Sequence, residues 1–190
     1  MVGDGDAPMP PAFRYNVEKT AQAVGFLLRQ PGRDHCAYMK VLKLLYVAER
    51  ESFLETGAPI TGDTLVSMDK GPVLSATYNL MQSPSNHAFW ARCFRPRGDH
   101  ELAIASDPGT DLLCPYEIDK LSQVAVRFAD KDRWDASRDT HNLPEWEDPQ
   151  GSSKIILLKT ILETKNKGGR TGRILREERA RQAFLDAVRG

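Results

Sequence analysis

The stretch of sequence that decides the fold runs from Lys40 to Gln82 and reads KVLKLLYVAERESFLETGAPITGDTLVSMDKGPVLSATYNLMQ. In its first part, apolar residues follow the helical period and cover so wide an arc that they predict a helix over 38–55 at the centre of the core. Gly57 ends this helix, and Pro59 follows at the distance expected of a helix terminator.

The second part of the stretch predicts a strand, a turn and another helix. Residues 63–68 have the β-branched content of a short strand. Lys70, Gly71 and Pro72 form a turn, and Pro72 is expected to occupy the first position of a helix over 72–82. The simplest role of Gly71 and Pro72 is therefore architectural, because they set the angle between strand and helix.

Periodic patterns predict further elements on both sides. Asn16 is expected to cap a helix that ends before Pro31. The period changes to two between 89 and 106, where FWARCFR and ELAIAS flank a turn, and this predicts a β-hairpin. The remaining predictions are a helix over 115–128, a loop-rich stretch, a helix from Ser152 or Ser153 to about Glu163, and a last helix over 174–188.

Length and composition indicate one globular domain. The chain has 190 residues, of which 41% are hydrophobic and 27% charged, as is typical of a protein with one well-buried core. No apolar run approaches the roughly 20 residues of a membrane helix, and the start of the chain lacks the features of a secretory signal. We expect a cytoplasmic protein without membrane contact, organised as a flexible tail (1–15), a folded domain (16–163), and a basic linker with a C-terminal helix (164–190).

Residues with reactive side chains form no recognisable reaction centre in the sequence. Cys36, Cys93 and Cys114 lie far apart without a CxxC pair, which indicates buried thiols. The four histidines are scattered, and no zinc signature is present. There is no GxSxG nucleophile motif, and residues 168–172 lack the spacing of a phosphate-binding loop. We therefore expect a protein that is not an enzyme and that holds no metal or cofactor.

Several residues of the stretch, and a later group, resemble the signature of a known family. They are Lys43, Leu44, Leu45, Tyr46, Ala48 and Arg50, then Gly57, Pro59, Ile60, Thr61 and Gly62, then Gly71, Pro72 and Val73, and finally Thr140, His141, Pro144 and Trp146. They resemble the Panacea domain of bacterial and phage antitoxins, including its SocA-like branch, over about residues 16–163. The resemblance implies a mainly helical α+β domain of about six helices, with a small antiparallel sheet made by the strand near 63–68 and the hairpin 89–106.

The resemblance also implies a function and a partner. Antitoxins of this family neutralise a protein toxin that is usually encoded by an adjacent gene. They either cover its working surface or, in the SocA-like branch, deliver it to an ATP-dependent protease. We expect the partner to contact Lys43, taken as an exposed position, and the loop-rich group of Trp134, His141 and Trp146, because aromatic residues in loops are favoured interface anchors. The alternative for both tryptophans is a place in the core or under a lid.

The basic end of the chain is a further candidate surface. Residues 154–190 contain ten Lys or Arg and four Asp or Glu, and Arg173, Arg176 and Arg179 recur at roughly helical spacing after a Gly-rich linker. This segment is either a solvated helix with local ion pairs, or an arm that docks on an acidic partner such as the toxin or a protease component.

A DNA-binding regulator is the competing function. The helices 38–55 and 72–82, followed by the hairpin 89–106, imitate the order of a winged helix, in which Arg92, Arg95, Arg97 and His100 charge the wing. The recognition helix expected there carries no Lys or Arg, however, and only Asn79 and Gln82 are suited to read a base. Nucleic acid is therefore a less favoured partner than a toxin.

Overall fold

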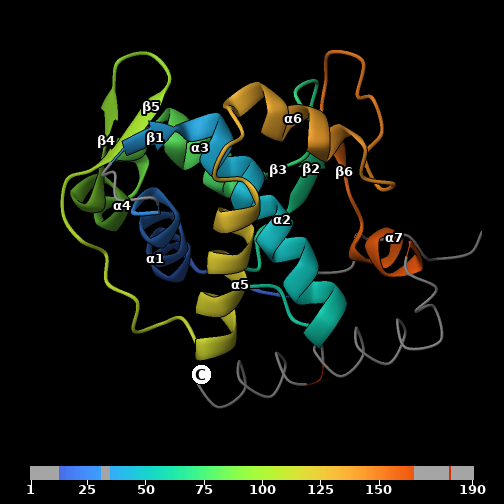
Figure 1. Ribbon diagram of the computed structural model, residues 1–190, viewed down its shortest axis with the longest axis horizontal. Helices are drawn as coiled ribbons and strands as arrows, with labels where there is room; N and C mark the ends of the chain where they lie inside the picture. The colour runs from blue at the N-terminus through green and yellow to red at the C-terminus, as the bar shows by residue number, and fades with distance from the viewer. Residues whose placement is uncertain (1–12, 31–34, 165–179, 181–190) are drawn as a thin grey trace, which may run out of the picture.

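The computed structural model describes residues 13–30, 35–164 and 180, in which helices pack around a central helix beside two small sheets (Figure 1). The helices are α1 (Val17–Leu28), α2 (Tyr38–Thr56), α3 (Ser75–Gln82), α4 (Ala88–Cys93), α5 (Pro115–Arg127), α6 (Arg133–His141) and α7 (Leu158–Glu163), with a 3₁₀ turn, η1 (Pro84–Asn86). The strands are β1 (His35–Ala37), β2 (Leu65–Ser67), β3 (Val73–Leu74), β4 (Phe94–Arg97), β5 (Glu101–Ile104) and β6 (Lys154–Ile155).

The predicted mainly helical α+β fold class is confirmed, but the strands form two sheets instead of one. All pairings are antiparallel, in the orders β1-β5-β4 and β3-β2-β6. The hairpin and the strand near 63–68 therefore belong to different sheets. The sequence analysis missed three short strands, β1, β3 and β6, which lie at edges of these sheets.

Helix α2 is the centre of the structure, as its wide apolar arc predicts. Every residue from Val41 to Arg50 is buried, because α1, α5, α6 and β3 pack around the helix. Gly57 ends it with a left-handed backbone (φ 84°), and the Gly57 amide donates to the Phe53 carbonyl. A glycine is suited to this position because it has no Cβ to oppose a positive φ.

Local capping fixes the starts of α1 and α5 where the sequence predicts them. The Asn16 side chain accepts a hydrogen bond from the Lys19 amide at 2.9 Å, which satisfies a free N–H of the first turn of α1. Helix α5 begins at Pro115, and the Glu117 carboxylate accepts from the Cys114 amide at 2.9 Å. Both predicted helices are confirmed.

The helix predicted over 72–82 begins three residues later than expected. Val73 and Leu74 instead form β3 and pair with Val66 and Leu65. The start of α3 is set by Asp63, whose carboxylate accepts from the amides of Ala76 and Thr77 at 3.0 and 2.8 Å. Pro72 therefore ends the turn before a strand, and its predicted place in the first helical turn is wrong.

The predicted hairpin is real but shorter than 89–106. Only β4 and β5 form it, around a turn that contains Gly98. Residues 88–93 form α4 instead, because Trp90 and Cys93 are both buried at helical spacing. Over seven residues, the alternation in FWARCFR fits a strand as well as it fits one helical turn followed by a strand.

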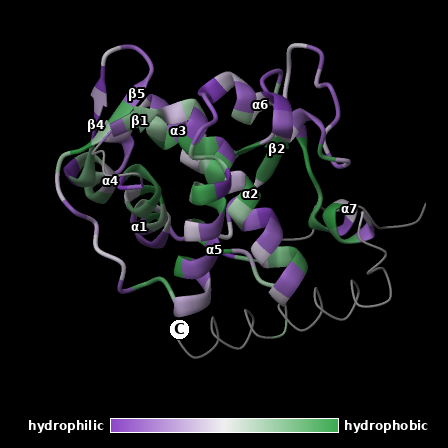
Figure 2. Ribbon diagram, in the orientation of Figure 1, coloured by the Kyte–Doolittle hydropathy of each residue, from purple (hydrophilic) through white to green (hydrophobic). Residues whose placement is uncertain are grey.

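The stretch after α5 was predicted to be rich in loops, but it contains α6. Asp132 caps this helix by accepting from the amides of Trp134 and Asp135, both at 2.7 Å. The buried face consists of the small residues Ala136, Ser137 and Thr140, and most of the helix is hydrophilic (Figure 2). No apolar stripe marks such a helix, so the periodicity did not predict it.

The C-terminal part also differs from its prediction. The helix expected over 152–163 is divided into β6, which pairs with β2, and the short helix α7. At the other end, Phe13 and Tyr15 pack against the core, so residues 13–15 of the predicted tail belong to the folded domain. The predicted helix over 174–188 lies outside the described residues except for Ala180. Within the described part of the chain, no helix combines the length and apolar character needed to cross a membrane.

Leu45→Ala is expected to destabilise the protein by about 2–5 kcal/mol, because Leu45 is fully buried in α2 and its truncation leaves a cavity in the core. Chemical denaturation measures the change. Val126→Ala on the exposed face of α5 is the control and should stay within about 0.5 kcal/mol of the wild type. Equal effects of the two substitutions would contradict the central position of α2.

Candidate functional site

A buried ion pair joins α2 to the segment that carries the last signature residues. Arg50 donates to Glu145 through Nε at 2.5 Å and through Nη2 at 3.1 Å, and the Tyr46 hydroxyl donates to the same carboxylate at 3.1 Å. Arg50 is 8% exposed and Glu145 4%. Burial and the neighbouring Glu145 carboxylate raise the pKa of Tyr46. Loss of one partner from such a pair leaves an uncompensated buried charge, so the pair fixes the chain around Pro144 and Trp146.

A second buried carboxylate of α2, Glu49, holds the loop over 58–62. It accepts from the amides of Ile60 and Thr61, both at 2.8 Å, from the Thr61 hydroxyl at 2.7 Å and from the Gly62 amide at 3.0 Å. Burial raises the pKa of Glu49 to about 7, and the four hydrogen bonds, which favour the ionised form, limit the rise. Signature residues Thr61 and Gly62 thus bind a side chain of α2.

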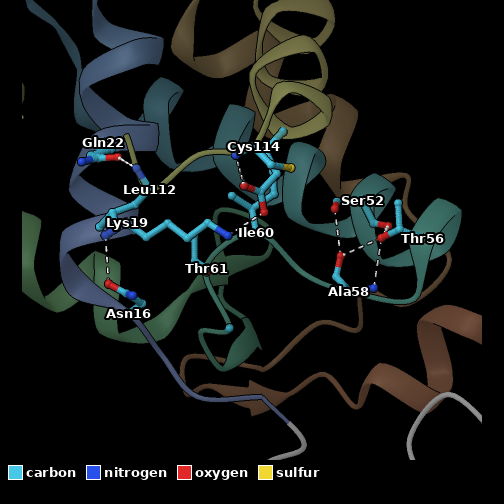
Figure 3. A network of polar contacts seen from close by, with 12 residues as sticks. Asn16, Lys19, Gln22, Ser52, Thr56, Ala58, Ile60, Thr61, Leu112 and Cys114 are labelled. Carbon is cyan, nitrogen blue, oxygen red and sulfur yellow. Dashed lines mark hydrogen bonds and ion pairs between the residues drawn. The ribbon is translucent and has the colours of Figure 1, made fainter. Parts of the chain in front are cut away.

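Other contacts complete the attachment of this loop. Ser52 and Thr56 of α2 donate to the Ala58 carbonyl, next to Pro59 (Figure 3). Gly62 has φ 73°, and a Cβ there would lie 2.5 Å from the Arg14 carbonyl oxygen, so the position requires glycine. A pocket of about 300 Å³ opens beside the loop, and the ion pair of Lys19 with Glu117, at 2.6 Å, lies in its wall.

The turn over 68–72 is held through its backbone carbonyls. Two residues of α6 and one residue after it contact these carbonyls. Ser137 Oγ donates to Lys70 O at 2.8 Å, His141 Nε2 lies 3.0 Å from Asp69 O, and Trp146 Nε1 donates to Met68 O at 3.1 Å. Because a carbonyl oxygen only accepts, the Asp69 contact requires a proton on Nε2 of His141. The rings of His141 and Trp146 also meet edge to face, with centroids 4.4 Å apart.

Lys43 completes this turn from the side of α2. Its Nζ donates to Pro72 O at 2.9 Å. A Cβ on Gly71, whose φ is 89°, would lie 3.1 Å from that Nζ and 2.9 Å from Thr140 Oγ1. The structure thus brings together Lys43, Gly71, Pro72, His141 and Trp146, which are far apart in the sequence, and Val73 follows directly in β3.

The prediction that Lys43 is exposed was wrong. Lys43 is 1% exposed, because other elements cover the whole circumference of α2. Burial lowers the pKa of Lys43 to about 7. A side chain in this position offers almost no surface to a partner, which argues for a structural role of Lys43 and against the predicted contact.

Trp134 differs from the other predicted contact residues because it is exposed. Its side chain lies on α6 with 44% exposure, whereas His141 and Trp146 are half-buried. Lys70 Nζ lies 5.5 Å and the Arg133 guanidinium 5.1 Å from its ring centroid. Pro144 is exposed at the end of the α6 region. Arg173, Arg176 and Arg179 lie outside the described residues, so their predicted role stays a prediction.

Two residues of the site were missed by the sequence analysis, Glu49 and Glu145. Glu49 had one available signal, a charged residue within an otherwise apolar, buried helical run. Glu145 lies between Pro144 and Trp146, but no local spacing connects it to Arg50, which is 95 residues away. Only the tertiary structure identifies it as a partner of α2.

The geometry defines an α+β domain whose signature residues form an internal scaffold of buried polar contacts. Within the described residues, no group of three or more His, Cys, Asp or Glu side chains is placed to hold a metal ion.

A family model described as "Antitoxin SocA-like, Panacea domain" matches residues 41–147, more than half of the chain, and the chain therefore belongs to this family. Searches of curated proteins and of solved structures gave no match. Membership of an antitoxin family agrees with a non-enzymatic role and implies a toxin as the partner.

Glu49→Gln is expected to lower the free energy of unfolding by about 1–3 kcal/mol at pH 8, because the amide nitrogen replaces an acceptor and leaves at least one loop donor unpaired. Urea denaturation measures the change. Glu163→Gln on the exposed face of α7 is the matched control and should have little effect. A Glu49→Gln protein as stable as the control would contradict the role of Glu49 as the acceptor for this loop.

Lys43→Met is expected to remove a pH dependence of stability. The unfolded lysine has a pKa near 10.5 and the folded one near 7, so the unfolded state binds more protons between these values and stability rises with pH. The wild type should gain up to about 1.4 kcal/mol per pH unit relative to Lys43→Met between pH 7 and 9.5.

Denaturation curves of both proteins across this pH range test the expectation, with Lys159→Met at an exposed position as the control. Parallel pH profiles of the wild type and Lys43→Met would contradict it. Lys43→Glu would leave melting unchanged if Lys43 were exposed, as the sequence predicted. It should instead destabilise the protein, because it places a buried carboxylate against the Pro72 carbonyl oxygen.

Proposed function

We propose that this protein is an antitoxin that neutralises a cognate protein toxin by direct, stoichiometric binding, and that the toxin is encoded by an adjacent gene. The observation that carries the proposal is the family match over 41–147. Within this range, the signature residues Lys43, Tyr46 and Arg50 are buried and hydrogen-bonded within the chain, so they belong to the scaffold described above.

The way in which the scaffold is built supports a binding role. Buried hydrogen bonds from α2 and α6 hold the loops over 58–62 and 68–72 in place. Rigid loops lose little conformational entropy when a partner binds, which favours affinity. The fold is therefore suited to present fixed surfaces to a protein partner.

We also propose that the toxin is either shielded or delivered to an ATP-dependent protease, and that its lifetime distinguishes these modes. Shielding leaves the toxin stable inside the complex. Delivery shortens its half-life whenever the antitoxin and the protease are both present. The expected basic arm with Arg173, Arg176 and Arg179 is a proposed contact for either partner.

DNA binding receives less support. Helix α3 has eight residues and carries no Lys or Arg, which leaves it without the charges that neutralise phosphates. In the hairpin, Arg97 already contacts His35 Nδ1 at 2.5 Å and lies 4.0 Å from Glu101. We therefore do not propose a regulator function.

Co-expression with the products of the adjacent genes tests the proposal. The expected result is that one of these products arrests growth, that this protein relieves the arrest, and that the two co-purify at near-equal stoichiometry through gel filtration. The half-life of the toxin, measured with and without the protease, assigns the mode. If no adjacent product is relieved of its toxicity and no complex survives gel filtration, the antitoxin proposal is wrong.

A further inference from the structure

The surface around Trp134 combines an exposed aromatic ring with several positive groups. Lys70 and Arg133 both lie over the ring, and a small hollow of about 50 Å³ adjoins them. We call this the Trp134 cluster. Its members are Tyr38, Met39, Lys70, His100, Arg133 and Trp134.

The positive charges of the cluster are available to a partner. Among the described residues, no carboxylate lies within ion-pair distance of Lys70 or Arg133. The lining of the hollow likewise contains no acidic side chain. The two carboxylates next to these residues in the sequence bind backbone amides: Asp69 accepts from the Gly151 amide at 3.0 Å, and Asp132 accepts from the first amides of α6.

The cluster is also held in a fixed arrangement. The Trp134 amide donates to the Asp132 cap at 2.7 Å, and the Lys70 carbonyl accepts from Ser137 at 2.8 Å. On the other side, the Tyr38 amide donates to the His100 carbonyl at 3.0 Å, and their rings meet edge to face. Four segments, from α2, the 68–72 turn, the β4–β5 hairpin and α6, thus meet at one surface whose backbone is already ordered.

We propose that the Trp134 cluster is the docking site for an acidic segment of the toxin, in which a carboxylate lies between Lys70 and Arg133 and a neighbouring apolar group packs on Trp134. This inference rests on the proposed antitoxin function and names its contact surface. Tryptophan and arginine are among the residues most enriched at the centres of protein interfaces. Lys70 and Arg133 line the same hollow, and a carboxylate accepts charge-assisted hydrogen bonds from both lysine and arginine.

A polyanion such as DNA fits the cluster less well. Each of its three basic residues directly follows an aspartate in the sequence, namely Asp69, Asp99 and Asp132. A long polyanion depends on a large excess of positive charge over a wide surface, which these aspartates reduce, whereas a single carboxylate needs only the two cations that line the hollow. The chemistry therefore favours an acidic protein segment over nucleic acid.

The test uses the full-length protein and the toxin that it neutralises in co-expression. Trp134→Ala is expected to weaken the complex by about 30-fold or more, as for an interface hot spot. The double variant Lys70→Glu, Arg133→Glu should weaken it further, and raising the salt concentration should weaken the wild-type complex. Ile155→Ala and Lys159→Glu are the matched controls at exposed positions away from the cluster, and they should bind as the wild type does. The substituted side chains are exposed except for Arg133, which is half-buried, and the melting temperatures of all variants check that they fold.

The outcomes separate this inference from the proposed function. If the wild type neutralises the toxin and the cluster variants bind it with unchanged affinity, the docking site is wrong and the antitoxin function stands. If the wild type forms no complex with any adjacent gene product, both the docking site and the antitoxin function are wrong. If the cluster variants lose binding to a 20-base-pair duplex DNA while toxin binding is unchanged, the cluster is a nucleic-acid site and the inference is overturned.

Discussion

Three charged side chains on the buried middle of α2 constrain the rest of the structure. Lys43, Glu49 and Arg50 lie within a run from Val41 to Arg50 in which every residue is buried. A buried charge costs several kcal/mol unless it is paired or hydrogen-bonded, so each of the three must recruit a partner from another segment. Lys43 takes the carbonyl of Pro72, Glu49 takes the loop over 58–62, and Arg50 takes Glu145.

These three contacts explain why irregular segments of the chain adopt fixed positions. The loops over 58–62 and 68–72 contain too few apolar residues to be held by burial alone, and instead they bind polar groups of α2 and α6. Helix α6 in turn has a buried face of small residues, and its Ser137 and His141 contact carbonyl groups of the 68–72 turn. Trp146, in the segment after α6, donates to the same turn. The helices and the loops therefore depend on one another through hydrogen bonds as much as through apolar packing.

The same arrangement separates the family signature from the surface. Most signature side chains are buried or half-buried: the apolar ones pack in the core, and the polar ones bind groups of their own chain. Residues outside the signature, such as Lys70 beside Gly71 and Trp134 on α6, are exposed instead, and they form the proposed docking site.

The sequence by itself determined the elements whose signals are local. The wide apolar arc of 38–55 marked α2 as the central helix, Asn16 and Pro115 marked helix starts, and Gly57 marked a helix end, because capping and periodicity act over a few residues. It did not determine α6, whose buried residues are small and polar, nor the division of 88–97 into a helix and a strand.

The tertiary structure alone decided which charges are buried and what they bind. From the sequence, Lys43 was predicted to be exposed, but it is buried. Glu145 pairs with Arg50, which is 95 residues away. Burial depends on what every other element packs against, and the partner of a buried charge is chosen by proximity in space. For that reason the signature residues could be identified in the sequence, whereas their role as an internal scaffold became visible only in the tertiary structure.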